Sequence, residues 1–291
     1  MTEFLQQLTN GLAAGSIYAL IAVGYSLVYG VLELINFAHG DIYMFATFVT
    51  VALLLTSVPW PVALIGGLIT AAVLGMLVER FAYRPLRDAN RIAPTVTAVG
   101  AALILENAAQ LIWGPETRPF PVPFATGLVH IGDAIFSQLQ FIVLATATVM
   151  AGALYAVVQH TDWGRSMRAI RDDTATAELI GIRVNRTIAL VYAVGSAMGL
   201  IGGLLFAAYY NTIYIGMGFT GTMNAFAAAV LGGIGSLKGA FVGGLLLGVT
   251  QALAVGYVAS GYQNTVAFLT LILVLLVRPT GLYGGLSGSR V

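Results

Sequence analysis

Residues 159–186, QHTDWGRSMRAIRDDTATAELIGIRVNR, are followed directly by the apolar stretch TIALVYAVGSAMGLIGGLL at residues 187–205. The first stretch is polar and rich in arginine, whereas the second has the length and apolar character of a membrane helix. The boundary between them predicts a structured platform at a membrane surface, which we call the platform (residues 159–186). A platform of this kind suits a soluble partner that supplies force or regulation.

The composition indicates that lipid surrounds most of the chain. Charged residues make up 9% of the sequence, hydrophobic residues make up 58%, and the mean hydropathy is +0.90. Soluble domains carry about 25% charged residues, so this chain cannot cover its surface with polar groups in water. The absence of cysteine excludes disulfides, thiolate metal sites and cysteine nucleophiles. The net charge of +1 gives no indication of nucleic acid binding.

The apolar runs predict an all-α polytopic membrane protein that forms one domain over residues 1–291. About twenty apolar residues span the hydrocarbon layer, so eight or nine membrane helices or half-helices are expected. The N-terminal residues lack the features of a signal peptide, and the first span is expected to be retained. The expected spans are 8–30, 36–57, 60–81, 94–113, 136–158, 187–210, 221–235, 239–257 and 261–277.

The distribution of arginine predicts the orientation of the chain. Nine of the twelve arginines lie in two loops, at residues 80–91 and within the platform, whereas the loop at 114–135 holds only one. The positive-inside rule therefore places the two arginine-rich loops in the cytoplasm and the 114–135 loop outside. The N-terminus is then external, and Arg278 and Arg290 indicate a cytoplasmic C-terminus. We expect a multi-pass protein of the cell (inner) membrane.

Two short helices are expected within the platform. Asp162 is expected to cap a helix that begins at Trp163, and Thr174 is expected to cap a second helix that ends at Gly181. Apolar side chains would hold this pair against the membrane domain or fill a groove on a partner. These are Met167, Ile170, Leu179 and Ile180.

The platform arginines allow two interpretations. Arg165, Arg168 and Arg171 recur every three residues and therefore lie on neighbouring parts of one helix face. They form either a docking surface for a soluble protein or positive anchors that meet phospholipid headgroups, and the spacing favours neither.

Three separated stretches resemble the membrane permeases of high-affinity branched-chain amino acid ABC importers. They are residues 164–207 (GRSMRAIRDDTATAELIGIRVNRTIALVYAVGSAMGLIGGLLFA), residues 15–44 (GSIYALIAVGYSLVYGVLELINFAHGDIYM) and residues 225–248 (AFAAAVLGGIGSLKGAFVGGLLLG). The short N-terminus resembles the H-like subunit of such importers rather than the longer M-like subunit.

The resemblance implies that the platform is the coupling loop that docks on an ATP-binding subunit. Carried over by position, the docking residues are Gly164, Arg165, Arg168, Ala169, Glu178, Gly181 and Ile182. The implied partners are a second, M-like permease subunit, two ATP-binding subunits and an external substrate-binding protein. This chain has no phosphate-binding loop of the type G-x-x-x-x-G-K-[ST], so ATP and Mg²⁺ are expected on the partner subunits and no cofactor is expected here.

Glycines recur at four-residue spacing along the apolar runs. Small residues of this kind allow helix backbones to approach closely in lipid, so helix packing is the expected role. The glycines are Gly11, Gly15, Gly195, Gly199, Gly203, Gly239, Gly243, Gly244 and Gly248.

A few polar residues fall within or beside the apolar runs, where an unpaired ionisable group is costly and marks a candidate for function. The candidates for a translocation pathway are Glu33, Asn36, His39, Asp41, Glu106, Asn107 and Asn224. The segment ELINFAHGD at 33–41 is expected to be a cytoplasmic turn with Asn36 capping the next helix, or else a broken helix that lines the pathway. Glu106 and Asn107 would lie at membrane depth or form a packing hydrogen bond.

No catalytic group of residues is expected. His39, His130 and His160 fall in separate parts of the predicted topology and predict neither a metal site nor a nucleophile. Four prolines in the external loop, at positions 115, 119, 121 and 123, favour an extended segment that connects helices or docks the external binding protein. Lys238, the only lysine, is interpreted as an interfacial anchor.

Three classes of function fit these observations. The first is the permease subunit of an ATP-driven importer for branched-chain or other hydrophobic amino acids. The second is an ion-coupled secondary transporter that uses Glu33, Asp41 or Glu106, and the third is a channel or membrane scaffold. The sequence does not distinguish a branched-chain amino acid from urea, an amide or an aromatic acid, nor a heterodimer from a homodimer.

Overall fold

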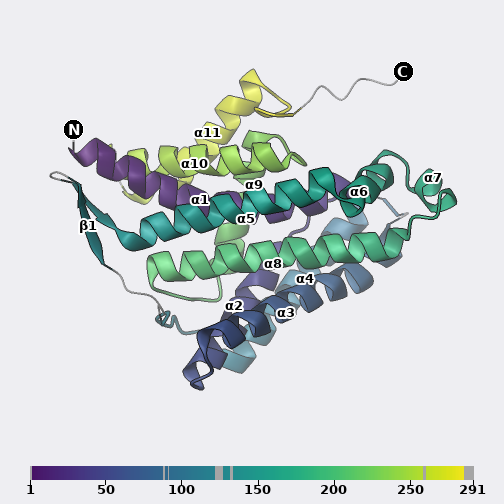
Figure 1. Ribbon diagram of the computed structural model, residues 1–291, viewed down its shortest axis with the longest axis horizontal. Coiled ribbons are helices and arrows are strands. Elements are labelled where there is room, and N and C mark those ends of the chain that lie inside the picture. The colour runs from purple at the N-terminus through teal and green to yellow at the C-terminus, as the bar shows by residue number, and fades with distance from the viewer. Residues whose placement is uncertain are drawn as a thin grey trace.

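The helices of the computed structural model lie side by side in a bundle (Figure 1). Residues 2–87, 89–90, 92–121, 127–131, 134–257 and 260–284 are described. The helices and strands are α1 (Thr2–Leu32), α2 (His39–Leu55), α3 (Trp60–Val78), η1 (Glu79–Tyr83), η2 (Arg84–Leu86), α4 (Ile92–Trp113), β1 (Leu128–Ile131), β2 (Ala134–Ser137), α5 (Gln138–His160), α6 (Asp162–Asp172), α7 (Thr174–Leu179), α8 (Val184–Tyr210), α9 (Met217–Gly232), α10 (Leu237–Tyr257), η3 (Ser260–Tyr262) and α11 (Gln263–Val277).

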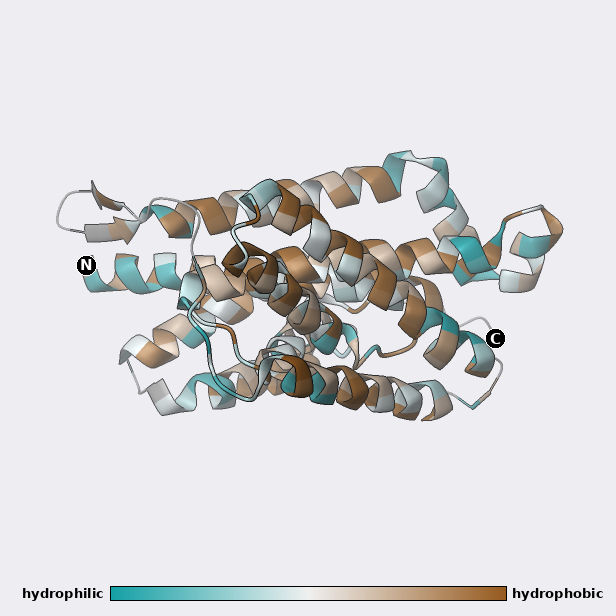
Figure 2. Cartoon of the chain, turned by 90° about the horizontal axis from the view of Figure 1, so that it is seen from below, coloured by the Kyte–Doolittle hydropathy of each residue, from teal (hydrophilic) through white to brown (hydrophobic). Residues whose placement is uncertain are grey.

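Six of the described helical segments are long and apolar enough to cross a membrane. They are Glu3–Leu32, Trp60–Leu86, Ile92–Trp113, Gln138–His160, Val184–Tyr210 and Leu237–Tyr257. Helices α2 and α11 are apolar but shorter. Figure 2 shows hydrophobic residues along the middle of the bundle and hydrophilic residues toward its ends. Large apolar side chains such as Leu111 (88% exposed) face outward, as lipid-facing or partner-facing side chains do.

Each expected span overlaps an observed helix, with two notable errors at the boundaries. The first helix begins at Thr2 rather than at residue 8, and the third continues to Leu86 through the π-helical turn η1. The described residues are mostly helical, as the all-α prediction expects, and the connection after α4 adds one short hairpin in which β1 and β2 pair antiparallel with Leu128 opposite Ser137. The segment at 114–121 is non-helical, as its prolines predict, and Arg118 pairs with Ile213 in an isolated bridge. Pro123 lies outside the described residues.

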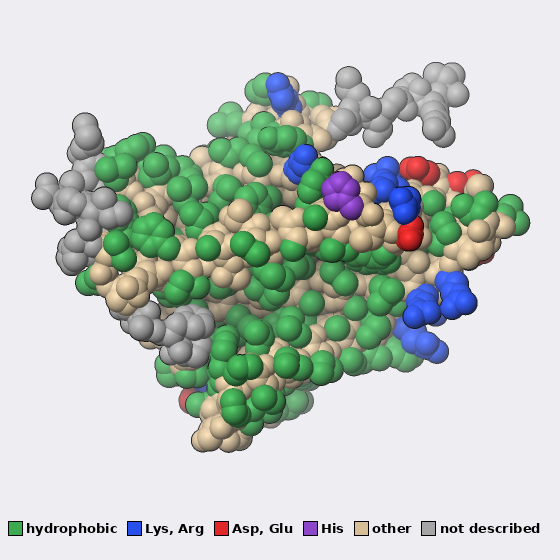
Figure 3. Space-filling view, viewed as in Figure 1, with side chains coloured by type: hydrophobic (Ala, Val, Ile, Leu, Met, Phe, Trp, Pro, Cys, Tyr) green, Lys and Arg blue, Asp and Glu red, His purple; other side chains and the backbone are tan. Residues whose placement is uncertain are grey.

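The two ends of the bundle differ in charge. We call the end with α6 and α7 the platform end, and the opposite end, with β1, β2 and the N-terminus, the hairpin end (Figure 1). Lys and Arg side chains on the visible face gather toward the platform end (Figure 3). Arg84 and Arg87 contact Asn185 at the start of α8, so the first arginine-rich loop lies there as well. Arg91 and Arg290 lie outside the described residues.

Helix α1 is the central helix of the bundle. In its most apolar 18-residue window, 89% of the residues are buried. Glycines allow the close approach of its neighbours: a Cβ atom on any of the nine glycines singled out in the sequence would lie within 3.0 Å of an atom of another helix. Gly15 approaches Gly244 and Gly248 of α10, while Gly24 approaches Gly195 of α8. Side-chain-free contacts of this kind supply the packing that apolar burial cannot supply in lipid.

Helices α2 and α9 begin inside the bundle. His39, the first residue of α2, lies against Gly199 near the middle of α8. The hydroxyl of Tyr43 in α2 donates a hydrogen bond of 2.8 Å to the carbonyl of Met217, the first residue of α9. The connections before these two helices, residues 33–38 and 211–216, therefore return the chain from the ends of α1 and α8 into the interior.

Candidate functional site

The platform consists of two helices whose caps lie one residue before the predicted ones. Thr161, not Asp162, is the N-cap of α6 and accepts a hydrogen bond from the Gly164 amide. Asp173, not Thr174, is the N-cap of α7 and accepts from the amides of Ala175 and Thr176. Hydrogen bonds from the side chain and the amide of Thr176 lower the pKa of the Asp173 carboxyl.

The four apolar side chains of the platform divide into two pairs. Met167 and Ile170 are buried, at 5% and 2% exposure, and hold α6 against the bundle. Leu179 and Ile180 are 87% and 69% exposed at the tip of the platform. The first pair therefore anchors the platform, and the second pair is available to a partner.

The seven predicted docking residues also have different environments. Gly164 is buried, and a Cβ atom there would overlap the carbonyl oxygen of Val158, so this glycine allows α6 to turn tightly away from α5. Arg168 is half-buried and donates a hydrogen bond of 2.8 Å to the same carbonyl. Ala169 and Ile182 are half-buried against the core. Arg165, Glu178 and Gly181 are exposed, and Gly181 has a φ of +88° in the turn after α7.

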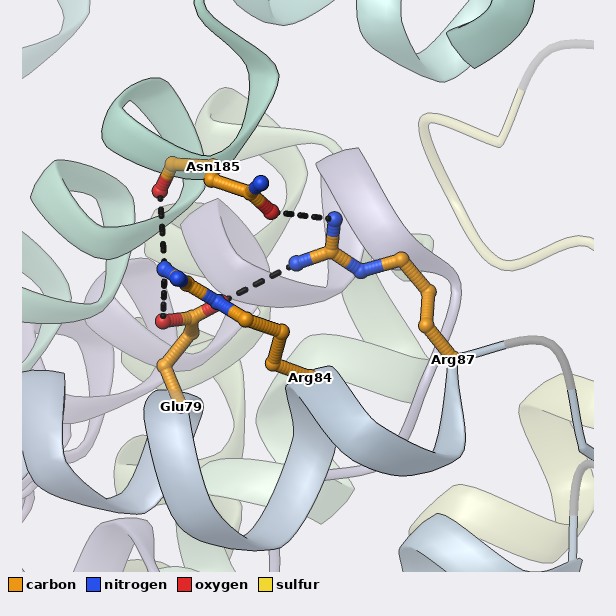
Figure 4. A network of polar contacts seen from close by, with 4 residues as sticks. All are labelled: Glu79, Arg84, Arg87 and Asn185. Carbon is orange, nitrogen blue, oxygen red and sulfur yellow. Dashed lines mark hydrogen bonds and ion pairs between the residues drawn. The ribbon is translucent and has the colours of Figure 1, made fainter.

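A buried carboxylate joins the end of the third span to the start of α8 (Figure 4). Glu79 in η1 has no exposed side-chain surface and forms ion pairs with Arg84 at 3.1 Å and Arg87 at 3.0 Å. Arg87 also donates a hydrogen bond of 3.2 Å to the Asn185 side chain, and Arg84 donates one of 3.5 Å to the Asn185 carbonyl. Asn185 lies in the first turn of α8, at the C-terminal end of the platform.

The same π-helical turn contacts the segment that leads into α2. The hydroxyl of Tyr83 donates a hydrogen bond of 2.9 Å to the Ile35 carbonyl and lies 3.4 Å from Asn36 Oδ1. Tyr83 also packs against Tyr192 of α8, with ring centroids 5.4 Å apart. Residues 79–83 thus connect the start of α8 with the broken segment at 33–38.

Of the two structures expected for residues 33–41, a surface turn or a broken helix, the structure has a broken and largely buried segment between α1 and α2. Only Glu33 is exposed; its φ is +54°, and it lines a cavity at the platform end with Arg171. Asn36 and His39 are buried inside the bundle, so the segment re-enters rather than turning at the surface. Asn36 does not cap α2, because its Oδ1 accepts from the Ala38 amide and the N-cap residue is Ala38 itself.

Polar atoms of this segment are buried with no hydrogen-bond partner among the described residues. They include Asn36 Nδ2 and both ring nitrogens of His39. The His39 ring lies edge-on to Tyr25 and Tyr43, with centroid distances of 6.0 and 6.4 Å. Unpaired polar atoms inside an apolar bundle are costly, so such a cluster marks a candidate for function.

Helices α2 and α9 cross at two glycines. A Cβ atom on Gly40 would overlap the carbonyl oxygen of Gly218, so neither position has room for a larger residue. Asp41 is 7% exposed, lies in the first turn of α2, and places its Oδ1 beside Gly218 in the first turn of α9. The positive ends of two helix dipoles therefore face one carboxylate.

The remaining pathway candidates lie on three different helices. Glu106 is half-buried in α4 and interacts electrostatically with Asp41. Asn107 is exposed and donates to the Leu103 carbonyl of its own helix. Asn224 is buried in α9 and accepts a hydrogen bond of 2.9 Å from Gln251 of α10. The structure thus brings Glu106 toward the α2–α9 crossing, but not Asn107.

Sequence reasoning missed Glu79 as a site residue. The signal available was one acidic residue before a loop with several arginines, which is also typical of a solvated loop end. Arg84 and Arg87 follow Glu79 by five and eight residues. The π-helical turn at residues 79–83 lets both arginines reach the Glu79 carboxylate at this spacing.

Comparisons with known proteins agree on one family. Residues 7–277 match the family model described as branched-chain amino acid transport system, permease component. The chain is 40% identical to the high-affinity branched-chain amino acid transport system permease protein BraD of Pseudomonas aeruginosa, over 97% of this chain and 96% of that protein. It is 38% identical to the corresponding permease protein LivH of Escherichia coli, with the same coverage.

Two more distant similarities are informative. The autoinducer 2 import system permease protein LsrC of an Enterobacter strain is 26% identical over 91% of this chain and 76% of that protein. A chain of the solved structure of PsaBC from Streptococcus pneumoniae in complex with Fab has a TM-score of 0.51 and 13% identity, covering 96% of this chain and 94% of that one, and so shares its fold. The family match and the relatives cover all three stretches that carried the resemblance, residues 15–44, 164–207 and 225–248. This multi-pass membrane protein therefore belongs to the family of branched-chain amino acid transport system permease components.

Proposed function

We propose that this chain is the membrane-spanning permease subunit of an ATP-driven importer for branched-chain amino acids. Family membership over nearly the whole chain carries the proposal and favours it over an ion-coupled carrier or a channel. Residues 1–291 form one permease domain in this proposal. Its partners are a second permease subunit, two ATP-binding subunits that hold ATP and Mg²⁺, and an external protein that delivers the substrate.

The platform end is proposed to face the cytoplasm. The arginine-rich loops lie at this end, and the positive-inside rule places such loops in the cytoplasm. The N-terminus and the β1–β2 hairpin then face the external binding protein. Since the chain has no cysteine, single cysteines at Glu116 and Leu179 would test this orientation by labelling with an impermeant maleimide in intact cells. Labelling of position 179 but not of position 116 would reverse it.

The platform is proposed to be the coupling element that docks on an ATP-binding subunit. Leu179 and Ile180 supply an exposed apolar tip, and Arg165 and Glu178 supply charge beside it. Gly164, Arg168, Ala169 and Ile182 support the platform from within. The platform arginines are interpreted either as a docking surface or as anchors to lipid headgroups. The exposed apolar residues beyond them favour docking, because an exposed apolar patch is typical of a protein interaction site.

Movement of the platform is proposed to reach the interior through Glu79 and Tyr83. The ion pairs of Glu79 hold the third span against the start of α8, and Tyr83 holds it against Asn36. A tilt of α8 would therefore move the re-entrant segment and the α2–α9 crossing. Packed elements joined in this way respond as rigid bodies.

The pathway is proposed to pass the α2–α9 crossing, with Asp41 as its charged group. A zwitterionic amino acid offers an ammonium group to Asp41 and a carboxylate to the nearby helix N-termini. Glu33, His39, Glu106, Asn107 and Asn224 stay candidates for the same pathway. Relatives named for branched-chain amino acids are 38–40% identical, which favours that substrate class over urea, amides or aromatic acids.

Purification and reconstitution test the function. Affinity purification of the chain from its native membrane in mild detergent should recover a second permease and the ATP-binding subunits, identified by mass spectrometry. In proteoliposomes with the external binding protein, leucine uptake should require ATP and persist when ionophores collapse ion gradients. Uptake by the chain alone, driven by a gradient, would refute the proposal. Competition by leucine and valine, but not by urea or phenylalanine, would identify the substrate class.

A further inference from the structure

A cationic cavity lies behind the platform, apart from the α2–α9 crossing. Its volume is about 240 Å³, and its walls come from α1, α5, α6 and the start of α10. Three basic side chains line it, Arg168, Arg171 and Lys238, and none of the described residues that line it is acidic. Asp172, which lies 3.4 Å from Arg171, lines the neighbouring cavity instead. The concentration of positive charge therefore favours an anionic ligand.

A buried hydroxyl on the wall of this cavity has no hydrogen-bond partner in the described part of the chain. Ser26 in α1 is 0% exposed, and its Oγ has no hydrogen-bond partner among the described residues. Several other hydroxyls of the apolar helices donate to a carbonyl four residues earlier, as Ser16 does to Leu12 and Thr47 does to Tyr43. A buried hydroxyl usually finds a partner, so the free Ser26 donor points to a ligand atom that accepts a hydrogen bond.

The N-terminus of α10 forms the third part of the site. Ser236 precedes this 21-residue helix and accepts a hydrogen bond from the Gly239 amide. Gly235, Ser236, Leu237 and Lys238 all line the cavity, so the positive end of the helix dipole faces it. Lys238 Nζ lies 4.5 Å from the centre of the Tyr155 ring, which keeps the ammonium group at the cavity wall.

We propose that this cavity binds a phosphate group. Two guanidinium groups, an ammonium group, a buried hydroxyl and a helix N-terminus match the charge and the several acceptor oxygens of phosphate. Apolar side chains of Leu27, Val31 and Leu237 share the same walls. The site lies where apolar helices meet the charged end of the bundle, which is the level of the lipid headgroups in the orientation proposed above. The phosphate therefore belongs to an anionic phospholipid headgroup or is free phosphate in solution.

The position of the site has a consequence for coupling. Arg168 and Arg171 belong to α6, whereas Lys238 and Ser236 belong to the start of α10. A bound phosphate would hold the platform against α10 and restrict its movement. This consequence rests on the proposed coupling function, whereas the binding site itself does not.

Binding is tested on the purified complex by native mass spectrometry, with no need for ATP or transport. The probes are phosphatidylglycerol, zwitterionic phosphatidylcholine and inorganic phosphate. The test variants are Arg171→Gln/Lys238→Gln, which removes two cations of the site, and Ser26→Ala, which removes the hydroxyl. The matched control is Arg183→Gln/Arg186→Gln, which removes two exposed cations of the same platform end.

Phosphatidylglycerol or phosphate should bind more tightly than phosphatidylcholine. The affinity should fall at least about ten-fold in the double site variant, fall less in Ser26→Ala, and stay unchanged in the control. Preference for phosphatidylglycerol would identify the ligand as a lipid headgroup, whereas binding of inorganic phosphate alone would identify it as free phosphate. An equal loss of affinity in the site and control variants would overturn the site. So would the absence of binding by both phosphatidylglycerol and inorganic phosphate. Failure of transport would leave this binding result intact, so the two proposals can fail separately.

Discussion

Glu79 and Arg87 lie 3.0 Å apart across a contact in which the carboxylate side chain is completely buried and the guanidinium side chain is 20% exposed. This difference in exposure means that the two partners contribute differently to stability. A carboxylate taken out of water costs several kcal/mol unless paired, whereas Arg84 and Arg87 keep partial contact with solvent. The arginines therefore stabilise the protein chiefly by neutralising the buried Glu79 carboxylate.

Removing the two arginines should destabilise the protein more than removing the carboxylate. We expect Arg84→Gln/Arg87→Gln to cost about 3–5 kcal/mol, because it leaves a buried charge unpaired. Glu79→Gln should cost less and should restore much of the stability when combined with the arginine changes. Thermal unfolding of the purified complex measures the stability of the wild type, the arginine variant, Glu79→Gln and their combination, which together form a mutant cycle. Additive effects of the three changes would show that the ion pairs do not couple.

The α2–α9 crossing should tolerate no side chain at either glycine. Gly40→Ala would force a methyl group onto the Gly218 carbonyl, and we expect it to cost at least about 1–3 kcal/mol and to abolish uptake. Gly152→Ala in α5 is the control, because a Cβ atom there meets nothing within 4 Å. That change should be neutral or slightly stabilising, since alanine favours a helix. Normal melting temperature and uptake in Gly40→Ala would exclude a tight crossing.

The helices were predictable because lipid leaves the backbone no other partner. An apolar run of sufficient length must satisfy its own N–H and C=O groups, and so the sequence predicted each of the six long apolar helices of the described chain in outline. Glycine spacing likewise predicted close packing, as at Gly15 and Gly195. These features are local, and local patterns are readable from one chain.

Features that depend on distant contacts were not predictable. The sequence at 33–41 allowed either a surface turn or a broken helix, and the burial of Asn36 and His39 together with the contact of Gly40 with Gly218 shows that it re-enters the bundle. Glu79 is buried because η1 and α8 enclose it, although its sequence context resembles an exposed loop end. The helix caps were missed by one residue, since Thr161 and Asp162, like Asp173 and Thr174, are all good capping residues.

The exposed tip of the platform should control assembly without affecting the fold. Leu179→Ser/Ile180→Ser changes apolar side chains that are mostly exposed in the described structure, so the melting temperature should stay unchanged. Co-purification of the ATP-binding subunits should fall at least about ten-fold, as expected when interface anchors are lost. Leu111→Ser, on an equally exposed position of α4, is the control for loss of an apolar side chain. Full recovery of the ATP-binding subunits would place the docking surface elsewhere.

Charge reversal at Arg165 tests the same surface more cleanly than reversal at Arg168. Arg165 is exposed and pairs with Asp162 on the platform surface, whereas Arg168 also donates to the Val158 carbonyl at the end of α5. Arg165→Glu should abolish uptake and leave the melting temperature unchanged. Arg168→Glu should lower both, because it removes a support of the platform. Uptake at the wild-type level in Arg165→Glu would show that this arginine does not contact the ATP-binding subunit.

Asp41 should be needed for transport but not for assembly. An ionisable side chain inside an apolar bundle is costly, so its neutral replacement should fold at least as well unless a partner is lost. We expect Asp41→Asn to reduce ATP-driven leucine uptake at least about ten-fold, because the ammonium group of the substrate loses its counter-charge while the helix N-termini remain. Glu106→Gln should reduce uptake less, since Glu106 lies on α4 and not at the α2–α9 crossing itself. Glu116→Gln removes an exposed carboxylate at the hairpin end and serves as the control of equal charge change. If Asp41→Asn lowers complex yield and uptake in parallel, Asp41 is a packing residue of the α2–α9 crossing, and the charged group of the pathway must be sought at Glu33 or Glu106.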